Sequence, residues 1–265
     1  MNSKQLILLG FGVGMVALLF ALPRTVLKKN EATNEISTKT EEINHSETGH
    51  SAFSKKTEQE VSELKSSLKK ELKEEWLFDL VVAYNNAFSY DSASKYAEQL
   101  LKNYPSDKNK IVLAEVLYEK FLNALSEQEA TNYAEKTREL FLQVKKPLNN
   151  NQKSKLAMTY TTTSTPMKGI SMLREVVEQE PNHELATYNL GLLSLKSGQF
   201  DKAKERFLTL RKTYPNNLTY SYYLGICYAQ LADNKSAIVE FQKIANLAKD
   251  PVLKSSSEKM LEQLK

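Results

Sequence analysis

The chain has 265 residues, a formal net charge of +4 and a mean hydropathy of −0.47. A charge this small for the length, with no lysine-arginine stripe interleaved with aromatic residues, argues against a nucleic acid partner. The single cysteine, Cys227, excludes an intrachain disulfide, and its place on an apolar helix face predicts a buried, unreactive thiol.

Residues 1–29 contain an apolar run with basic residues on both sides. Leu6–Leu22 is nearly all apolar, and a lysine precedes it while Arg24 and two further lysines follow. At about 1.5 Å per residue, this run is near the short limit for crossing a hydrocarbon core. The sequence predicts a single transmembrane helix at residues 6–22, with a cleaved signal peptide as the alternative. Pro23 and the lack of a small-x-small motif argue against cleavage.

Two features of the sequence give opposite predictions for the orientation of this segment in the membrane. The basic residues after the run favour a cytoplasmic carboxyl end, whereas a signal-anchor so close to the amino terminus exports the rest of the chain. We expect the rest to lie on the periplasmic face of a bacterial inner membrane. Gly10 and Gly14 have the G-x-x-x-G spacing of closely packed membrane helices, so a homo-oligomer is a secondary hypothesis.

Residues 30–54 are rich in Glu, Thr, Ser and Asn and are predicted to form a flexible tether, because they carry too few apolar residues to order themselves. Residues 55–75 are predicted to form a charged amphipathic helix. Its apolar stripe consists of Val61, Leu64, Leu68 and Leu72. The stripe is short for a coiled coil, so docking on the first hairpin is preferred, with Trp76 and Phe78 at the junction.

Residues 74–147 are predicted to form two degenerate helical hairpins. The first is Glu74–Pro105, which ends in a Tyr-Pro pair, and the second consists of helices at about 110–125 and 127–145. Asn150–Pro181 is predicted to form a third hairpin. Its inner turn is long because Thr161–Pro166 is poor in helix formers.

Residues 148–265 carry a repeat with a period of about 34 residues. The pairs at this spacing are Gly191 and Gly225, Ala203 and Ala237, Phe207 and Phe241, and Pro181 and Pro215. Such a period is typical of a helix–turn–helix unit that buries its apolar face by stacking on a neighbour.

The helix boundaries in this region are set by breaking and capping residues. Ser197-Gly198 and Asp233-Asn234 are expected to separate the two helices of each copy, and Asp201 is expected to cap a second helix. Pro251 is expected to end the second copy, and a closing helix is expected at about residues 254–264.

These residues resemble the tetratricopeptide repeat family, whose pattern is W-x2-L-G-x2-Y, then A-x3-F, then P. The matching residues are Leu190-Gly191, Ala203, Phe207 and Pro215, then Leu224-Gly225, Tyr228, Ala237 and Phe241. Thr187 and Ser221 stand at the tryptophan position, and Ser194 at a tyrosine position. The resemblance implies an all-α, right-handed α-solenoid of helical hairpins, five of them from about residue 74.

The resemblance also implies a groove, because the first helix of each unit lines the concave face in this family. The positions that it marks are Lys155, Met158, Tyr188, Asn189, Leu192, Lys196, Tyr222, Tyr223, Ile226 and Gln230. Asn189 stands where the family often has an asparagine that binds a peptide backbone. The three tyrosines fit two roles equally, as partner-binding anchors or as packing between helices. The residues needed to clamp an acidic peptide terminus are incomplete, which argues against recognition of a chaperone tail.

No catalytic or metal-binding pattern is found in the sequence. His45 and His50 lie in the predicted tether and His183 in a turn, with no cluster at metal-ligand spacing. G-x-S-x-G, H-E-x-x-H and phosphate-binding glycine loops are missing. The sequence thus predicts a non-enzymatic scaffold without cofactor or metal, anchored in a membrane and binding a partner protein segment. The alternative is a structural protein that self-assembles through its anchor and the helix at 55–75.

Overall fold

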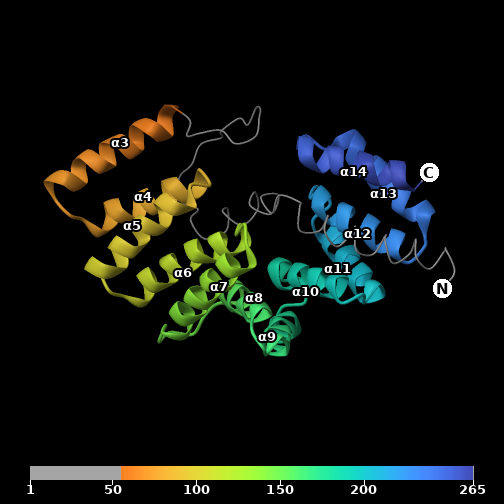
Figure 1. The fold of residues 1–265 in the computed structure, drawn as a ribbon, viewed down its shortest axis with the longest axis horizontal. Coiled ribbons are helices and arrows are strands. Elements are labelled where there is room, and N and C mark those ends of the chain that lie inside the picture. The colour runs from red at the N-terminus through yellow and green to blue at the C-terminus, as the bar shows by residue number, and fades with distance from the viewer. Residues whose placement is uncertain (1–54, 265) are drawn as a thin grey trace. The chain divides into compact units, whose positions relative to one another are not determined.

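The computed structural model describes residues 55–264, and all regular elements among them are helices (Figure 1). These residues form two compact units, 55–173 and 174–264. The expected all-α class is confirmed for this part of the chain. None of its helices is long and apolar enough to cross a membrane. The expected membrane helix at residues 6–22 and the expected tether at 30–54 lie outside the described residues.

The elements of the first unit are α3 (Lys55–Lys70), α4 (Glu74–Asn86), α5 (Tyr90–Asn103), α6 (Asp107–Leu122), α7 (Glu127–Leu142), α8 (Asn150–Thr159), the 3₁₀ turn η2 (Tyr160–Thr162) and α9 (Pro166–Gln179), which crosses into the second unit. The helices from α3 to α8 contact their neighbours in chain order. In the three segments between residues 74 and 181 where hairpins are expected, the structure has the helix pairs α4–α5, α6–α7 and α8–α9.

Helix α3 is shorter than the sequence indicates. Its stripe does dock on the first hairpin, because Val61, Leu64 and Leu68 pack in one cluster with residues of α4 and α5. The expected continuation to residue 75 is wrong, since α3 ends at Lys70 and Leu72 is 46% exposed. The Leu72 carbonyl instead accepts a hydrogen bond from the Tyr104 hydroxyl at 2.8 Å. This bond to the end of α5 fixes the non-helical connection into α4.

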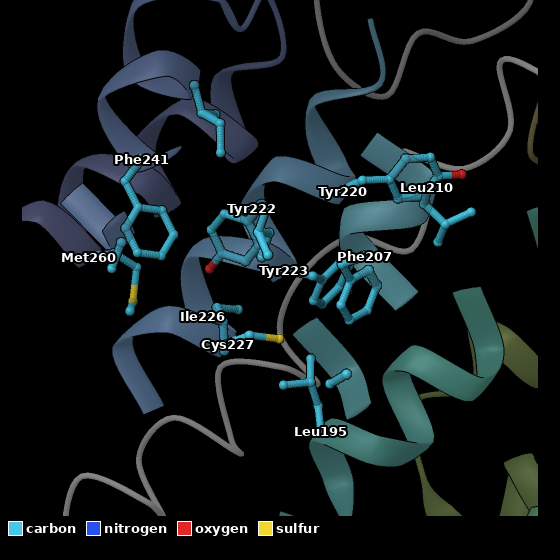
Figure 2. Packing of buried hydrophobic residues seen from close by; sticks show 14 of the residues in the cluster. Leu195, Phe207, Leu210, Tyr220, Tyr222, Tyr223, Ile226, Cys227, Phe241 and Met260 are labelled. Carbon is cyan, nitrogen blue, oxygen red and sulfur yellow. The ribbon is translucent and has the colours of Figure 1, made fainter. Parts of the chain in front are cut away.

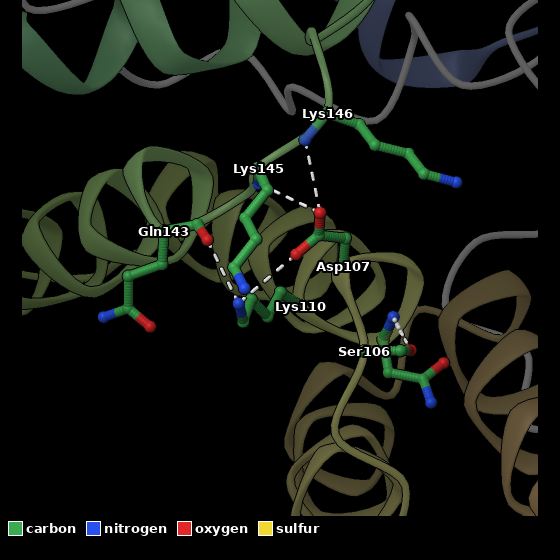
Figure 3. A network of polar contacts seen from close by, with 7 residues as sticks. Ser106, Asp107, Lys110, Gln143, Lys145 and Lys146 are labelled. Carbon is green, nitrogen blue, oxygen red and sulfur yellow. Dashed lines mark hydrogen bonds and ion pairs between the residues drawn. The ribbon is translucent and has the colours of Figure 1, made fainter.

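A polar network around Asp107 holds the connection between α7 and α8 (Figure 3). Asp107 Oδ2 accepts from the backbone N–H of Lys145 at 2.9 Å and of Lys146 at 3.2 Å, and Oδ1 lies 3.3 Å from Lys110 Nζ. Desolvation acts to raise the pKa of Asp107, but these hydrogen bonds outweigh it and the pKa lies below its ordinary value. The network turns residues 143–146 towards α6, so α7 ends at Leu142 and not at 145 as expected.

The second unit contains two helix pairs and a closing helix. They are α10 (Glu184–Lys196), α11 (Phe200–Thr213), α12 (Leu218–Gln230), α13 (Asn234–Leu247) and α14 (Pro251–Gln263). Two sequence expectations are corrected here. Gln199 is the N-cap of α11, and Asp201 lies in its first turn, where it pairs with Lys204 at 3.0 Å. Pro251 begins α14 and does not end α13, because proline is tolerated in a first turn, where the Asp250 carboxylate caps Val252 and Leu253.

The repeated glycines of α10 and α12 make room for a phenylalanine of the following helix. A Cβ at Gly191 would lie 2.7 Å from Phe207 Cζ, and one at Gly225 would lie 2.9 Å from the Phe241 ring. Both rings are completely buried, and they belong to the continuous core of this unit (Figure 2). The repeat period of the sequence therefore records one packing contact made twice.

Three hairpin turns share one backbone geometry. Phe88, Gly198 and Ala232 have φ values of 57°, 71° and 59°, and each follows the last turn of a first helix. In each turn this residue and the next donate back to the helix, as Phe88 N does to Asn85 O and Ser89 N to Tyr84 O. This is the Schellman pattern, in which glycine is favoured because a side chain is strained at positive φ.

Replacing Phe88 with glycine is expected to raise the free energy of unfolding by about 0.5–1 kcal/mol, because the strain of a bulky residue at positive φ exceeds the entropy cost of glycine. Urea titrations followed by circular dichroism measure the change. Ala87→Gly is the matched control, since Ala87 has φ −85° and gains no relief. If both variants lose stability equally, the turn at Phe88 is not strained.

Candidate functional site

The ten residues marked by the sequence lie on α8, α10 and α12. In the first unit, Lys155 Nζ is 3.5 Å from Glu115 Oε1, and the lysine side chain is only 13% exposed. Met158 is half-buried beside the cluster of Tyr118, Phe121 and Ala134. Both α8 residues therefore bind α8 to its neighbouring helices.

Tyr188 of α10 and Tyr222 and Tyr223 of α12 are buried in the core of the second unit, where Figure 2 shows the two α12 residues. Tyr223 stacks on Phe207 with ring centroids 5.1 Å apart, Tyr188 meets the same ring edge-on at 6.2 Å, and Tyr222 meets Phe241 at 5.6 Å. Burial raises the pKa of Tyr222 well above its ordinary value. Of the two roles left open by the sequence, these contacts favour packing between helices. Ile226 is buried in the same cluster.

The accessible members of the set lie near the carboxyl ends of the two helices. Leu192 is half-buried and Lys196 exposed on α10, and Gln230 is half-buried on α12. An aliphatic, a cationic and an amide side chain at these positions offer an incoming chain both apolar contact and hydrogen bonds.

The Asn189 amide is buried and its donor group has no partner. The side chain is 3% exposed, and its Nδ2 has no hydrogen-bond acceptor. A buried donor left without an acceptor costs about 1–3 kcal/mol, so such groups call for an explanation. The hydroxyls of Thr187, Ser221 and Thr219 on the same two helices are also buried and unpaired.

The described residues contain neither a cluster of metal ligands nor a reactive thiol. No group of three or more His, Cys, Asp or Glu side chains among them could hold a metal ion. Cys227 is buried as expected, and burial raises the pKa of its thiol to about 12. A thiol with that pKa is a weak nucleophile at neutral pH.

Comparison with known proteins identifies the repeats. Residues 188–251, which include most of α10 and all of α11–α13, match the model of the tetratricopeptide repeat family. In this segment the chain contains tetratricopeptide repeats. No curated protein matches it.

The solved structures that match most of the chain include three with TM-scores above 0.5, two of which are named as tetratricopeptide repeat proteins. PilW, a widely conserved type IV pilus biogenesis factor, is 14% identical with a TM-score of 0.58, covering 76% of this chain and 90% of its own. A tetratricopeptide repeat protein from Parabacteroides merdae is 13% identical with a TM-score of 0.58, covering 77% and 78%. A thermophilic tetratricopeptide repeat protein of Thermus thermophilus is 18% identical with a TM-score of 0.56, covering 72% and 100%. At these identities the likeness extends to the fold alone.

The sequence did not predict the structural role of one residue in the repeats. His183, expected only in a turn, is buried and caps α10 through its ring nitrogen Nδ1, which accepts from the Ala186 N–H at 3.1 Å. Its position immediately before the helix, one repeat period ahead of the asparagine Asn217, was the signal that could have revealed this.

Proposed function

We propose that the chain is a membrane-anchored scaffold whose tetratricopeptide repeats bind an extended segment of a partner protein at the α10–α12 face. This face is defined by Asn189, Leu192, Lys196 and Gln230. Tetratricopeptide repeat proteins generally mediate protein–protein interaction, and the repeats at 188–251 support that role here. The anchor is the apolar segment at residues 6–22, with the repeats on the periplasmic face.

The observation that carries the proposal is the unpaired amide donor of Asn189. Because Nδ2 is buried, an incoming main-chain carbonyl reaches it once the side chains that cover it move aside, and the hydrogen bond then gives this donor the acceptor that it lacks. Leu192 and Lys196 lie three and seven residues further along α10, on the same side of the helix. An extended segment along α10 would therefore find an amide donor, an apolar contact and a cation in succession.

The alternative, self-assembly through the anchor and the helix at 55–75, gains no specific support from α3. Val61, Leu64 and Leu68 of α3 are used within the chain against α4 and α5. An apolar stripe that is already covered has little left to offer a second copy.

Replacing Asn189 with alanine is expected to lower partner recovery at least about fivefold, because the partner's carbonyl loses its donor at a cost of about 1–3 kcal/mol. The full-length chain is cross-linked in carbonate-washed membranes, purified, and its co-purifying proteins are quantified. Helicity and thermal stability are expected to stay unchanged or rise, because alanine is the better helix former.

Gln242→Ala is the matched control, since Gln242 is an exposed amide on α13, a helix that carries none of the residues that define the α10–α12 face. Recovery that is equal in the wild type and Asn189→Ala would refute the binding face. Loss of the chain in the carbonate wash would refute the anchor and leave the binding face to be measured in detergent extracts.

A further inference from the structure

The cap of α10 differs chemically from the other side-chain caps in the described part of the chain. His183 Nδ1 accepts the Ala186 N–H, whereas the remaining side-chain caps are hydroxyl, amide or carboxylate groups. Those caps are Ser106, Ser126, Asn149, Asn217, Asp233 and Asp250. Of these side chains, only an imidazole changes its charge between about pH 5 and pH 8.

The following repeat provides an internal reference for this position. Asn217 stands one repeat period after His183 and caps α12, its Oδ1 accepting the Thr219 N–H at 3.1 Å. The two caps close the first turns of the two helices that carry the candidate binding face. One of them keeps its acceptor at every pH, and the other loses its acceptor when it takes up a proton.

The surroundings of His183 act on its charge in opposite directions. The side chain is 6% exposed and lies at the positive end of a helix dipole, and both conditions disfavour the imidazolium. The carboxylates of Glu180, after α9, and Glu184, in α10, favour it. Burial dominates, so the pKa of His183 lies below its ordinary value.

The neighbouring helices contact this turn through two tyrosines. Tyr220 of α12 donates its hydroxyl hydrogen bond to the Glu184 carboxylate, and the Tyr214 hydroxyl, after α11, donates to the Asn182 carbonyl at 3.5 Å. The first turn of α10 is thus joined to two other helices of the same unit. Glu184, the first residue of α10, is thus the direct link between the capped turn and α12.

We propose that His183 is an acid-sensitive cap, whose protonation opens the first turn of α10 and loosens the α10–α12 face. Protonated Nδ1 has no lone pair for the Ala186 N–H, and the imidazolium is repelled by the amino end of the helix. Because the unfolded chain binds the proton more readily, the cap's contribution is complete above about pH 6.5 and is lost as the pH falls through the folded-state pKa.

The consequence for binding rests on the proposed function. Asn189, Leu192 and Lys196 all follow on α10, within the helix that His183 caps. Opening of the first turn shortens that helix from its amino end, towards Asn189. We therefore expect the partner to dissociate in acid and to stay bound at neutral pH.

Hydrogen exchange of the full-length chain in detergent tests the cap without any partner. Between about pH 7.5 and pH 5.5, the opening constant of the amides at 185–187, corrected for intrinsic exchange, is expected to rise about fivefold in the wild type, the equivalent of one lost cap. His183→Asn, which copies the cap of the next repeat, is expected to remove the rise. The amides at 219–221 of α12 serve as the internal control in each sample.

Asn217→His is the reciprocal variant, and it is expected to give α12 the pH response that α10 has. An equal rise in the wild type and His183→Asn would overturn the proposal. His183→Ala is expected to show open amides at both pH values, and closed amides would equally overturn it. Because these measurements need no partner, a failed partner capture refutes only the proposed function.

Discussion

Replacing Phe207 with alanine is expected to lower the free energy of unfolding of the second unit by about 3–5 kcal/mol. The ring is completely buried, stacks on Tyr223 at 5.1 Å and meets Tyr188 edge-on at 6.2 Å. It also occupies the space left by the missing side chain of Gly191. The substitution thus removes contacts on three sides, and the helices cannot close the cavity without losing their register.

Urea unfolding followed by circular dichroism measures this loss. Val239→Ala is the control, because Val239 is an aliphatic residue on α13 that is 63% exposed, and its truncation is expected to change stability by less than about 0.5 kcal/mol. Gly191→Ala with Phe207→Leu tests the pairing itself. Gly191→Ala is expected to cost less stability when residue 207 is leucine than when it is phenylalanine. If the cost is the same in both backgrounds, the glycine–phenylalanine contact does not set the packing.

The periodic part of the fold could be predicted from the sequence because one contact is repeated with the same residue types. Where the small and the large residue of this contact have changed places between the two helices, the sequence no longer reveals the repeat. Val81 and Ala97 have the same spacing from each other as Gly191 and Phe207, and both are buried, one in α4 and one in α5. The larger residue has moved to the first helix and the smaller one to the second. Packing constrains the total side-chain volume between the two helices, but either helix can supply the larger side chain.

The helix ends that the sequence missed are set by contacts between distant residues. Tyr104 fixes the carbonyl of Leu72, and Asp107 binds the backbone of Lys145 and Lys146. Local propensity carries no information about such bonds, so helices predicted to reach residues 75 and 145 end earlier.

At the candidate site, too, the sequence predicts the features that depend on neighbouring residues but not those that depend on contacts between distant residues. Helical spacing places Tyr188 and Tyr222 on one side of their helices but does not reveal that Phe207 and Phe241 cover them. The unpaired amide of Asn189 and the cap at His183 depend on burial, which follows from packing in three dimensions. The binding role of all ten predicted residues remains a prediction.

Replacing Gly169 with alanine is expected to destabilise the first unit by about 1–3 kcal/mol, although alanine is the better helix former by about 1 kcal/mol. A Cβ at this position would lie 2.2 Å from the Ala157 carbonyl oxygen and 3.2 Å from Tyr160 Cβ. The obstacle is backbone, so no side-chain rotation relieves it, and α9 must move away from α8. Propensity and close approach therefore predict opposite signs for one methyl group.

Trp76 in α4, the single tryptophan of the chain, provides a fluorescence signal for unfolding of the same unit. Ser171→Ala is the matched control, because Ser171 is exposed on the same helix and its replacement is expected to change stability by less than about 0.5 kcal/mol. A Gly169→Ala protein that gains stability, as helix propensity alone predicts, would mean that α8 and α9 do not approach this closely. A large loss would show that Gly169, in the least regular of the hairpins, has the role that Gly191 and Gly225 have in the regular ones, with a carbonyl in place of the phenylalanine ring.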